Sequence, residues 1–193
     1  MKREAGNRVQ ALYRALLEEY GPQGWWPIRG AYDGRTPTRD EQFEICIGAI
    51  LTQNTAWKNV EKALQNLGAF HHQSLRRLSL QELAHRIRPA GYFNQKAKKI
   101  KCFLEFLDSG KLRTRANLLR VWGLGPETVD SILLYAYGRP YFVVDAYTRR
   151  ILSSLGWIEE RASYADVQRL FHTALPRSVP LYKEYHALFV AHG

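Results

Sequence analysis

Cysteine is scarce in this chain, with Cys46 and Cys102 as its two thiols. Two cysteines are too few for a disulfide framework, a zinc site built of cysteines or a four-cysteine iron-sulfur cluster. The six histidines show no metal-ligand spacing. We therefore expect no metal and no cofactor. Cys46 lies in an apolar stretch, which favours a small core residue.

Long hydrophobic runs are also missing. No apolar stretch approaches the roughly 20 residues of a membrane-spanning helix, and the opening MKREAGNRVQ lacks the hydrophobic core of a signal peptide. With 46% hydrophobic and 24% charged residues, the composition is typical of a soluble globular protein. We expect a cytoplasmic protein without a membrane partner.

Acidic residues are few relative to basic ones: 18 against 28, a formal charge of +10. Such an excess predicts a polyanionic partner. Each basic cluster could alone be a solvated helix face. The clusters are Lys96, Lys98, Lys99 and Lys101; Arg113 and Arg115; Arg76 and Arg77; and Arg149 and Arg150.

Apolar residues recur with helical spacing along most of the chain, and no internal repeat is visible, which predicts a nearly all-helical fold. Helices are expected over residues 7–20, 40–51, 57–67, from Ser79 to before Pro89, 94–107, 114–122, 126–137, after Asp145, after Ser163, and 181–190. A short buried extended segment is expected at 141–144. Gly/Pro breaks near 21–38 and 138–140 border a central domain, 36–138; the two ends, 1–35 and 139–193, form the second.

The segment VWGLGPETVDSILLYAYGRPYFVVDAYTRR, residues 121–150, carries the strongest functional signal. Gly123 and Gly125 can take backbone conformations closed to other residues, and Pro126 suits the first position of a helix. The amides around Gly125 would then face outward at the positive end of a helix dipole, which attracts phosphate. Asp145 follows at the start of another helix.

Together with Leu51-Thr-Gln-Asn-Thr55, this segment resembles the helix-hairpin-helix (HhH-GPD) DNA glycosylases of the endonuclease III superfamily, from Trp25 to Gly193. The resemblance implies an all-α fold of two helical domains, with a helix-hairpin-helix motif at about 114–137 and the active site in the cleft between the domains. It also implies that the protein is a monomer, acts on damaged double-stranded DNA and is associated with the nucleoid.

The resemblance makes Asp145 the catalytic carboxylate. Hydrolysis of an N-glycosidic bond builds positive charge on the sugar, which a fixed carboxylate can stabilise while it orients water. The alternative is that Asp145 only caps its helix. The implied DNA-binding residues are Gly123, Leu124, Gly125 and Thr128 of the hairpin, Gln53 as the wedge that fills the gap left by the flipped base, Asn54 beside it, and Lys96. For Gln53 the alternative is a polar helix end, and for Lys96 a solvated helix face.

Glu127 marks a departure from part of the family. Members that also cut the strand resemble GVGxKT, with a lysine that forms a Schiff base, whereas this chain has GLGPET. Imine formation needs an amine, so Glu127 argues for a monofunctional glycosylase without AP-lyase activity. Glu127 is a candidate catalytic residue, or else a glutamate stabilised by the helix dipole.

Tryptophans indicate the base pocket. Trp25, Trp26, Pro27 and Trp57 stand where the 3-methyladenine DNA glycosylase III branch carries pocket residues, and WWP, AILTQNT and GYFNQKAKKI are similar to that branch. Electron-poor alkylated purines stack well between aromatic rings. Core packing is the alternative for these residues, and it is the expectation for Trp122 and Trp157.

The sequence thus predicts a glycosylase that flips out an alkylated purine resembling 3-methyladenine and hydrolyses its bond to deoxyribose. Alternatives are an endonuclease III-like enzyme for an oxidised pyrimidine or a mismatched base, and a non-catalytic DNA-structure binder. Relatives continue beyond a His-Gly like His192-Gly193, so we expect either a naturally short protein or a truncated sequence without a pocket residue from that tail.

Overall fold

The computed structural model describes residues 2–68 and 71–193, which form two compact units. One unit comprises residues 1–36 and 133–193, and the other comprises residues 37–132. The borders between the units thus fall at 36/37 and 132/133, whereas the sequence predicts them at 35/36 and 138/139. The described residues form helices and no strand, with one isolated bridge between Ile28 and Ala31, so the all-α prediction is confirmed.

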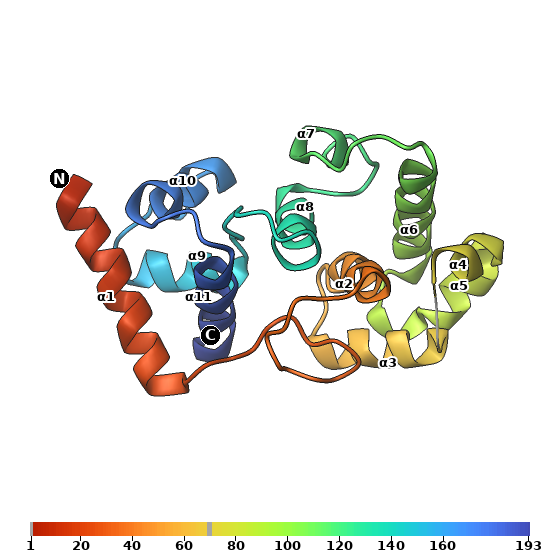
Figure 1. Ribbon diagram of the computed structural model, residues 1–193, viewed down its shortest axis with the longest axis horizontal. Coiled ribbons are helices and arrows are strands. Elements are labelled where there is room, and N and C mark those ends of the chain that lie inside the picture. The colour runs from red at the N-terminus through yellow and green to blue at the C-terminus, as the bar shows by residue number, and fades with distance from the viewer. Residues whose placement is uncertain (1, 69–70) are drawn as a thin grey trace. The chain divides into compact units, whose positions relative to one another are not determined.

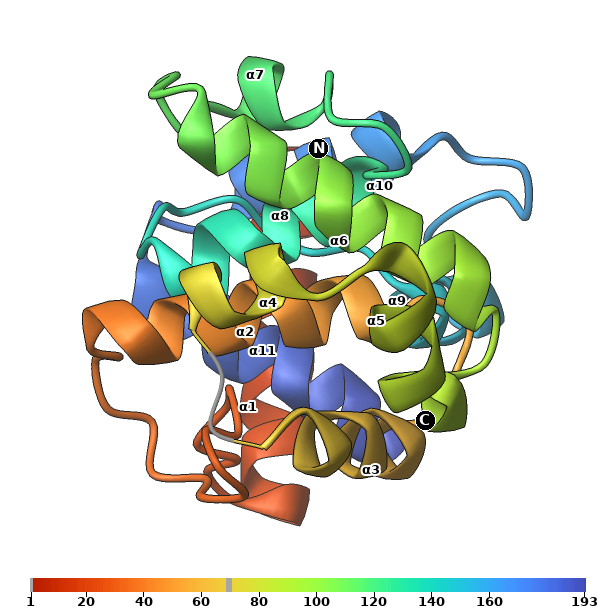
Figure 2. The ribbon, with the colours of Figure 1, turned by 90° about the vertical axis from the view of Figure 1, so that its right-hand side faces the viewer.

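The unit of residues 37–132 holds the central helices (Figure 1). They are α2 (Arg39–Leu51), α3 (Trp57–Leu67), α4 (His72–Arg77), α5 (Leu80–Arg86), the 3-10 helix η1 (Arg88–Ala90), α6 (Phe93–Asp108), α7 (Arg115–Leu118) and α8 (Pro126–Ser131). Figure 2 shows α4 and α5 beside α6, on which both pack. The apolar spacing predicts a buried face of α6 with Ile100, Phe103, Leu104 and Leu107. The first three are buried, and Leu107 is half-buried.

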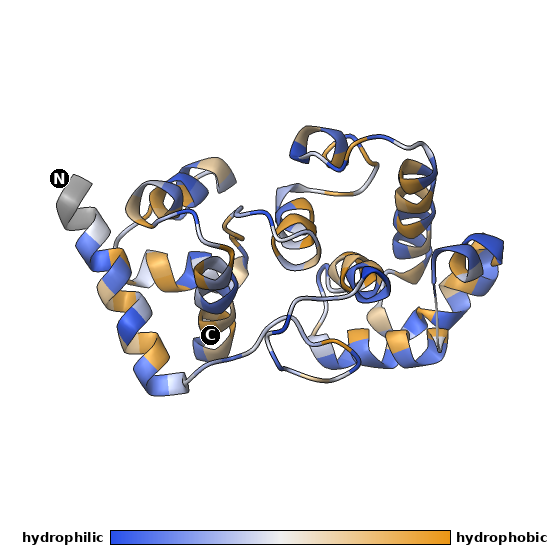
Figure 3. Ribbon diagram, viewed as in Figure 1, coloured by the Kyte–Doolittle hydropathy of each residue, from blue (hydrophilic) through white to orange (hydrophobic). Residues whose placement is uncertain are grey.

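The other unit combines both ends of the chain. Its helices are α1 (Lys2–Tyr20), most of the π-helical turn η2 (Ile132–Ala136), α9 (Ala146–Ser154), α10 (Tyr164–Ala174) and α11 (Val179–His192). Helix α1 packs on α10 and α11 (Figure 1). Polar and apolar residues alternate along α1 (Figure 3), and Val9 and Leu16 are buried. An amphipathic stripe therefore holds the N-terminal helix on its unit.

Local signals fix several helix starts. Ser79 accepts a hydrogen bond from the Glu82 amide, and the Glu82 carboxylate accepts one from the Ser79 amide at 2.7 Å, which is the predicted capping box. Thr38 and Glu41 form a second box. The helix expected to reach Trp122 ends at Leu118, because residues 119–124 turn into the hairpin.

An aromatic core organises the unit that contains both chain ends. Phe142 and Phe171 stack with ring centroids 3.7 Å apart, and Tyr185 and Phe189 of α11 stack at 4.8 Å. Residues 142–144, from the predicted extended segment, are buried and non-helical. This core fixes the segment that leads directly into Asp145, so the carboxylate is carried by a rigid support.

Candidate active site

Asp145 caps α9 with one of its two carboxylate oxygens. The Thr148 amide and the Thr148 hydroxyl both donate to Oδ1, at 2.7 and 2.8 Å. The other oxygen, Oδ2, lies 3.5 Å from Nε2 of His186, and the Asp145 side chain is 13% exposed. Capping and catalysis are therefore compatible, because the cap occupies Oδ1 and leaves Oδ2 for another task.

Opposing influences set the pKa of Asp145. Burial disfavours the anion and would raise the pKa, but the contact with His186, the positive charge that this ring can carry and the two hydrogen bonds from Thr148 outweigh burial. The pKa of Asp145 is lowered from its ordinary value. At neutral pH the group is therefore a carboxylate.

His186 was missed by the sequence analysis. It projects from α11, and its Nδ1 lies 2.7 Å from the hydroxyl of Tyr135 in η2. Tyr135 is fully buried, and its hydroxyl oxygen also lies 3.1 Å from the Lys183 carbonyl oxygen. His186 is followed by the apolar run ALFVA, a pattern that predicts a core position and no particular partner.

Trp25 lies in the same unit and contacts this group. Its ring centroid is 6.0 Å from that of His186 and 6.3 Å from that of Tyr135, and the side chain is half-buried. Tyr32 adds an edge contact at 6.5 Å. The His186 ring therefore contacts both the Asp145 carboxylate and the half-buried Trp25 ring.

The expectation that Trp26 and Pro27 contact the base directly is corrected, because both side chains are buried. Trp26 is 6% exposed, its ring packs on Tyr135 with centroids 5.1 Å apart, and Pro27 is buried as well. Side chains covered in this way present no free face to a base. Trp26 instead supports Trp25 and Tyr135, whose rings it contacts.

The hairpin between α7 and α8 forms the predicted Gly-Leu-Gly turn. Gly123 has a φ of 79°, which side-chain-bearing residues rarely adopt, and the Leu124 amide donates to the Val121 carbonyl at 3.2 Å. Gly125, the N-cap of α8, has a φ of −87°, so the expectation of an unusual backbone is wrong there. Leu124 is buried and Pro126 is the first residue of α8.

Gln53 is bound to this hairpin. Its Nε2 donates to Oγ1 of Thr128 at 2.7 Å and to the Gly123 carbonyl at 3.3 Å, while the Lys99 ammonium donates to its Oε1. Thr128 is buried, so its hydroxyl supports Gln53, and the expectation that it binds DNA directly is corrected. Asn54 is exposed, with a φ of 51°.

Lys96 also departs from the sequence analysis. The side chain is 1% exposed and its ammonium donates to the Ala90 carbonyl at 2.7 Å. Both earlier interpretations, a phosphate contact and a solvated helix face, require an exposed ammonium, so both are wrong. The lysine instead fastens α6 to the end of η1.

Trp122 was expected to pack in the core, but its side chain is 47% exposed, so that expectation is wrong. The ammonium of Lys98 lies 4.5 Å from its ring centroid, in a cation-π contact. Both residues are exposed on the unit that carries the hairpin. An exposed aromatic ring and a cation beside the Gly-Leu-Gly turn can contact a nucleic-acid backbone.

Two further candidates belong to the same unit as the hairpin. Trp57 is the first residue of α3, and its indole N–H donates to Glu61 at 3.1 Å. Glu127 is exposed in the first turn of α8, and its carbonyl accepts from the Ser131 hydroxyl at 2.8 Å. A carboxylate in that turn suits the helix dipole.

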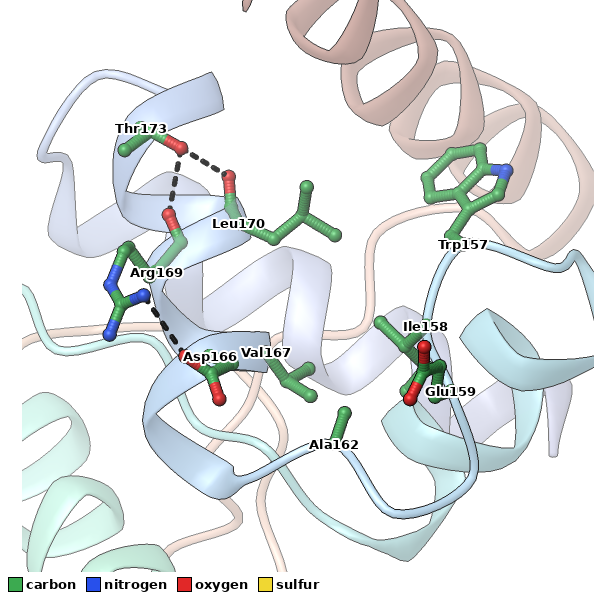
Figure 4. A pocket seen from close by; sticks show the side chains of 9 residues that line it. All are labelled: Trp157, Ile158, Glu159, Ala162, Asp166, Val167, Arg169, Leu170 and Thr173. Atoms are coloured by element: carbon green, nitrogen blue, oxygen red, sulfur yellow. Dashed lines mark hydrogen bonds and ion pairs between the residues drawn. The ribbon is translucent and has the colours of Figure 1, made fainter.

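A separate hollow lies beside α10 (Figure 4), where Val167, Leu170, Ile158 and Ala162 supply apolar atoms. Among its polar groups, Arg169 pairs with Asp166, Thr173 donates to backbone carbonyls, and Glu159 adds a carboxylate. Asp145, His186 and the hairpin residues do not line this hollow, so it is not part of the candidate active site. Within residues 2–68 and 71–193, no cluster of three or more His, Cys, Asp or Glu could hold a metal ion. No helix in the described part of the chain has the length and apolarity to cross a membrane.

The chain belongs to the HhH-GPD superfamily of base excision DNA repair proteins, whose family pattern matches residues 47–177. It is therefore a DNA glycosylase of base excision repair. A Methanocaldococcus jannaschii protein named as a DNA repair glycosylase is 41% identical over the whole chain and 90% of that protein. Endonuclease III of Sulfolobus acidocaldarius is 28% identical over 94% of this chain and 84% of its own length.

Solved structures agree with this assignment of the fold. The 3-methyladenine DNA glycosylase of H. pylori, bound to 1,N6-ethenoadenine, aligns with a TM-score of 0.77 and 26% identity over 96% of this chain and 95% of that one. An endonuclease III trapped covalently on DNA aligns with a TM-score of 0.81 and 20% identity over 97% and 85%.

Proposed function

We propose that the protein is a monofunctional DNA glycosylase that flips an alkylated purine out of duplex DNA and hydrolyses its N-glycosidic bond. The observation that carries the proposal is the placement of Asp145, a carboxylate held by Thr148, ionised at neutral pH and adjacent to the His186 and Trp25 rings. A fixed anion of this kind stabilises the cationic sugar that forms as the base departs.

The hairpin supplies the second part of the proposal. Gly123 and Gly125 flank a turn that opens α8, and Gly125 contributes no side chain to cap the amides of the first turn. Such amides bind phosphate oxygens. Gln53, held against the hairpin, is proposed to replace the extruded nucleotide after release from Thr128, with Asn54 exposed beside it.

The choice of an alkylated purine rests on the aromatic groups. Trp25 offers an accessible ring that Trp26 and Tyr135 support, and an electron-poor purine gains about 1–3 kcal/mol from one such stacking contact. The likeness to the H. pylori 3-methyladenine glycosylase supports the same class. Alkylation weakens the glycosidic bond, so one carboxylate suffices as catalyst.

The absence of lyase activity is proposed from Glu127. This residue stands where strand-cutting relatives carry the nucleophilic lysine, and a carboxylate cannot form an imine with the opened sugar. The proposed product is therefore an intact strand with an abasic site. Cytoplasmic, nucleoid-associated action by a monomer is part of the same proposal.

The test is a survey of base release under single-turnover conditions. The protein is incubated with methylated DNA, with duplexes carrying oxidised pyrimidines, and with duplexes carrying mismatched thymine or uracil, and free bases are separated by chromatography. We expect 3-methyladenine from methylated DNA. Release confined to an oxidised or mismatched base would assign the alternative substrate class, and no release from any duplex would favour a DNA-structure binder.

A borohydride trap separates the two reaction types. Reduction with borohydride during turnover fixes a Schiff base as a covalent protein–DNA adduct. We expect base release without an adduct and without strand cleavage before alkali treatment. A trapped adduct would overturn the monofunctional assignment and leave the substrate class as measured.

A further inference from the structure

A row of three polar groups leads from the protein core to the Asp145 carboxylate. The Tyr135 hydroxyl lies 2.7 Å from Nδ1 of His186, and Nε2 of the same ring lies 3.5 Å from Oδ2 of Asp145. The three residues come from η2, α11 and the start of α9. Because Tyr135 is fully buried and His186 is 5% exposed, bulk water does not compete for these contacts.

The Tyr135 hydroxyl keeps its proton. Burial, and to a smaller extent the negative charges of Asp145 and Glu184, raise the pKa of Tyr135 well above its ordinary value. That proton has two acceptors within reach, Nδ1 of His186 and the Lys183 carbonyl at 3.1 Å. The choice between them decides which nitrogens of the imidazole carry hydrogen.

The first choice places an N–H on the side of Asp145, and the second does not. If Tyr135 donates to Nδ1, a neutral ring must carry its hydrogen on Nε2. If Tyr135 donates to the Lys183 carbonyl, Nδ1 must itself donate, and a lone pair on Nε2 would face the carboxylate anion. That repulsion disfavours the second arrangement, so we take Tyr135 as the donor to Nδ1. The hydrogen on Nε2 then lies on the side of Asp145, whose Oδ2 is 3.5 Å away.

We propose that His186 is a positioning residue for Asp145, fixing Oδ2 as Thr148 fixes Oδ1, and that Tyr135 holds His186 for this purpose. The inference rests on the proposed function, because it takes Asp145 as the carboxylate that faces the sugar. The separation of 3.5 Å exceeds an ordinary hydrogen bond of about 2.7–3.2 Å. Catalytic hydrogen bonds commonly shorten when the substrate binds.

Holding both oxygens has a clear benefit for the reaction. A carboxylate anchored by Thr148 alone can rotate about its side-chain bonds and direct Oδ2 away from the sugar. With Nε2–H in place the anion is oriented before the charge develops, so no reorganisation is needed in the transition state. A residue that merely packs against Trp25 would not have this effect.

The test uses two abasic-site analogues in otherwise identical duplexes. A pyrrolidine analogue is protonated and imitates the cationic sugar, whereas a tetrahydrofuran analogue is neutral and has the same shape. The wild type should bind the pyrrolidine duplex at least about tenfold more tightly than the tetrahydrofuran duplex. Asp145→Asn should abolish this preference, since the anion is gone.

The His186 variants then separate positioning from packing. His186→Leu should lose most of the preference and bind the tetrahydrofuran duplex as the wild type does. His186→Gln, whose amide N–H can take the place of Nε2–H, should retain it. Tyr135→Phe keeps the ring but removes the hydroxyl, and it should reduce the preference in the same direction as His186→Leu.

The outcomes that overturn the inference are distinct from those that overturn the proposed function. Equal weakening toward both duplexes in His186→Leu, or a full preference in Tyr135→Phe, would make His186 a packing residue. A preference retained by Asp145→Asn would refute the assignment of Asp145 itself. Thermal unfolding of each variant checks the fold, and if His186→Leu does not fold, the opposite results expected for His186→Gln and Tyr135→Phe decide.

Discussion

The Lys99 side chain occupies the space where a side chain at Gly123 would lie. A Cβ added to Gly123 would stand 2.5 Å from Cγ of Lys99, well inside van der Waals contact. The same lysine donates to Oε1 of Gln53, and Nε2 of Gln53 donates to the Gly123 carbonyl at 3.3 Å. Glycine at this position therefore maintains both the hairpin turn and the link to the proposed wedge.

Gly123→Ala should destabilise the protein and weaken its hold on DNA. The φ of 79° costs a residue with a Cβ roughly 1–2 kcal/mol, and the lysine must also move. Gly125→Ala is the matched control, because its φ is −87° and nothing lies within 4 Å of the added carbon. Thermal unfolding should show a loss for Gly123→Ala alone, whereas both variants should bind duplex more weakly. An unchanged melting temperature in Gly123→Ala would contradict the turn geometry.

Asp145→Asn should lower the single-turnover rate of base release by at least about 100-fold, because the neutral amide cannot balance the positive charge on the sugar. Affinity for a tetrahydrofuran duplex should persist. Asp166→Asn is a suitable control, since Asp166 also lies at a helix start in the same unit but its side chain is 57% exposed. Unchanged turnover in Asp145→Asn would defeat the catalytic assignment.

Thr148→Val should change the pH dependence of base release. The Thr148 hydroxyl donates to Oδ1 and helps to lower the pKa of Asp145. Its removal raises that pKa, so the carboxylate is protonated at a less acidic pH and the acid limb of the rate profile moves upward. Thr148→Ser keeps the hydroxyl and should keep the wild-type limb. The rate of release measured across the acidic range checks both, and identical limbs would show that Asp145 does not control the profile.

Salt dependence should distinguish two lysines on α6. Lys98 is exposed beside Trp122, whereas Lys96 is buried and bonded to Ala90. If Lys98 neutralises one phosphate, Lys98→Ala should reduce the slope of log affinity against log salt by about 0.9. Lys96→Met should leave the slope unchanged and lower stability instead. Equal slopes for wild type and Lys98→Ala would remove Lys98 from the DNA-binding surface.

Features that depend on neighbouring residues were accessible from the sequence. The Ser79 box, the Gly-Leu-Gly turn and the cap at Asp145 each involve residues within a few positions of one another, and the backbone geometry fixes how they meet. The helices could be predicted from the spacing of apolar residues for the same reason. The π-helical turn η2 did not, because it has no distinctive local pattern.

Features that depend on distant partners were not accessible. His186 contacts Asp145 because α11 packs on α9, and nothing near residue 186 indicates this pairing. Lys96 follows an exposed residue pattern, yet η1 places the Ala90 carbonyl within reach of its ammonium. Trp122 is an apolar residue that the hairpin turns outward. Lys96 and Trp122 thus depart from the usual preference of their residue type, whereas His186 is buried as its pattern predicts and only its partners were unforeseen.

The buried ammonium of Lys96 links the fold to alkaline conditions. Burial, assisted by the nearby charge of Lys99, lowers the pKa of Lys96 from 10.5 to about 8. Between these two values the unfolded chain retains a proton that the folded protein releases, so folding becomes more favourable as the pH rises through that interval. Mildly basic solutions should thus favour the folded state through Lys96, while they slightly reduce the positive charge of α6.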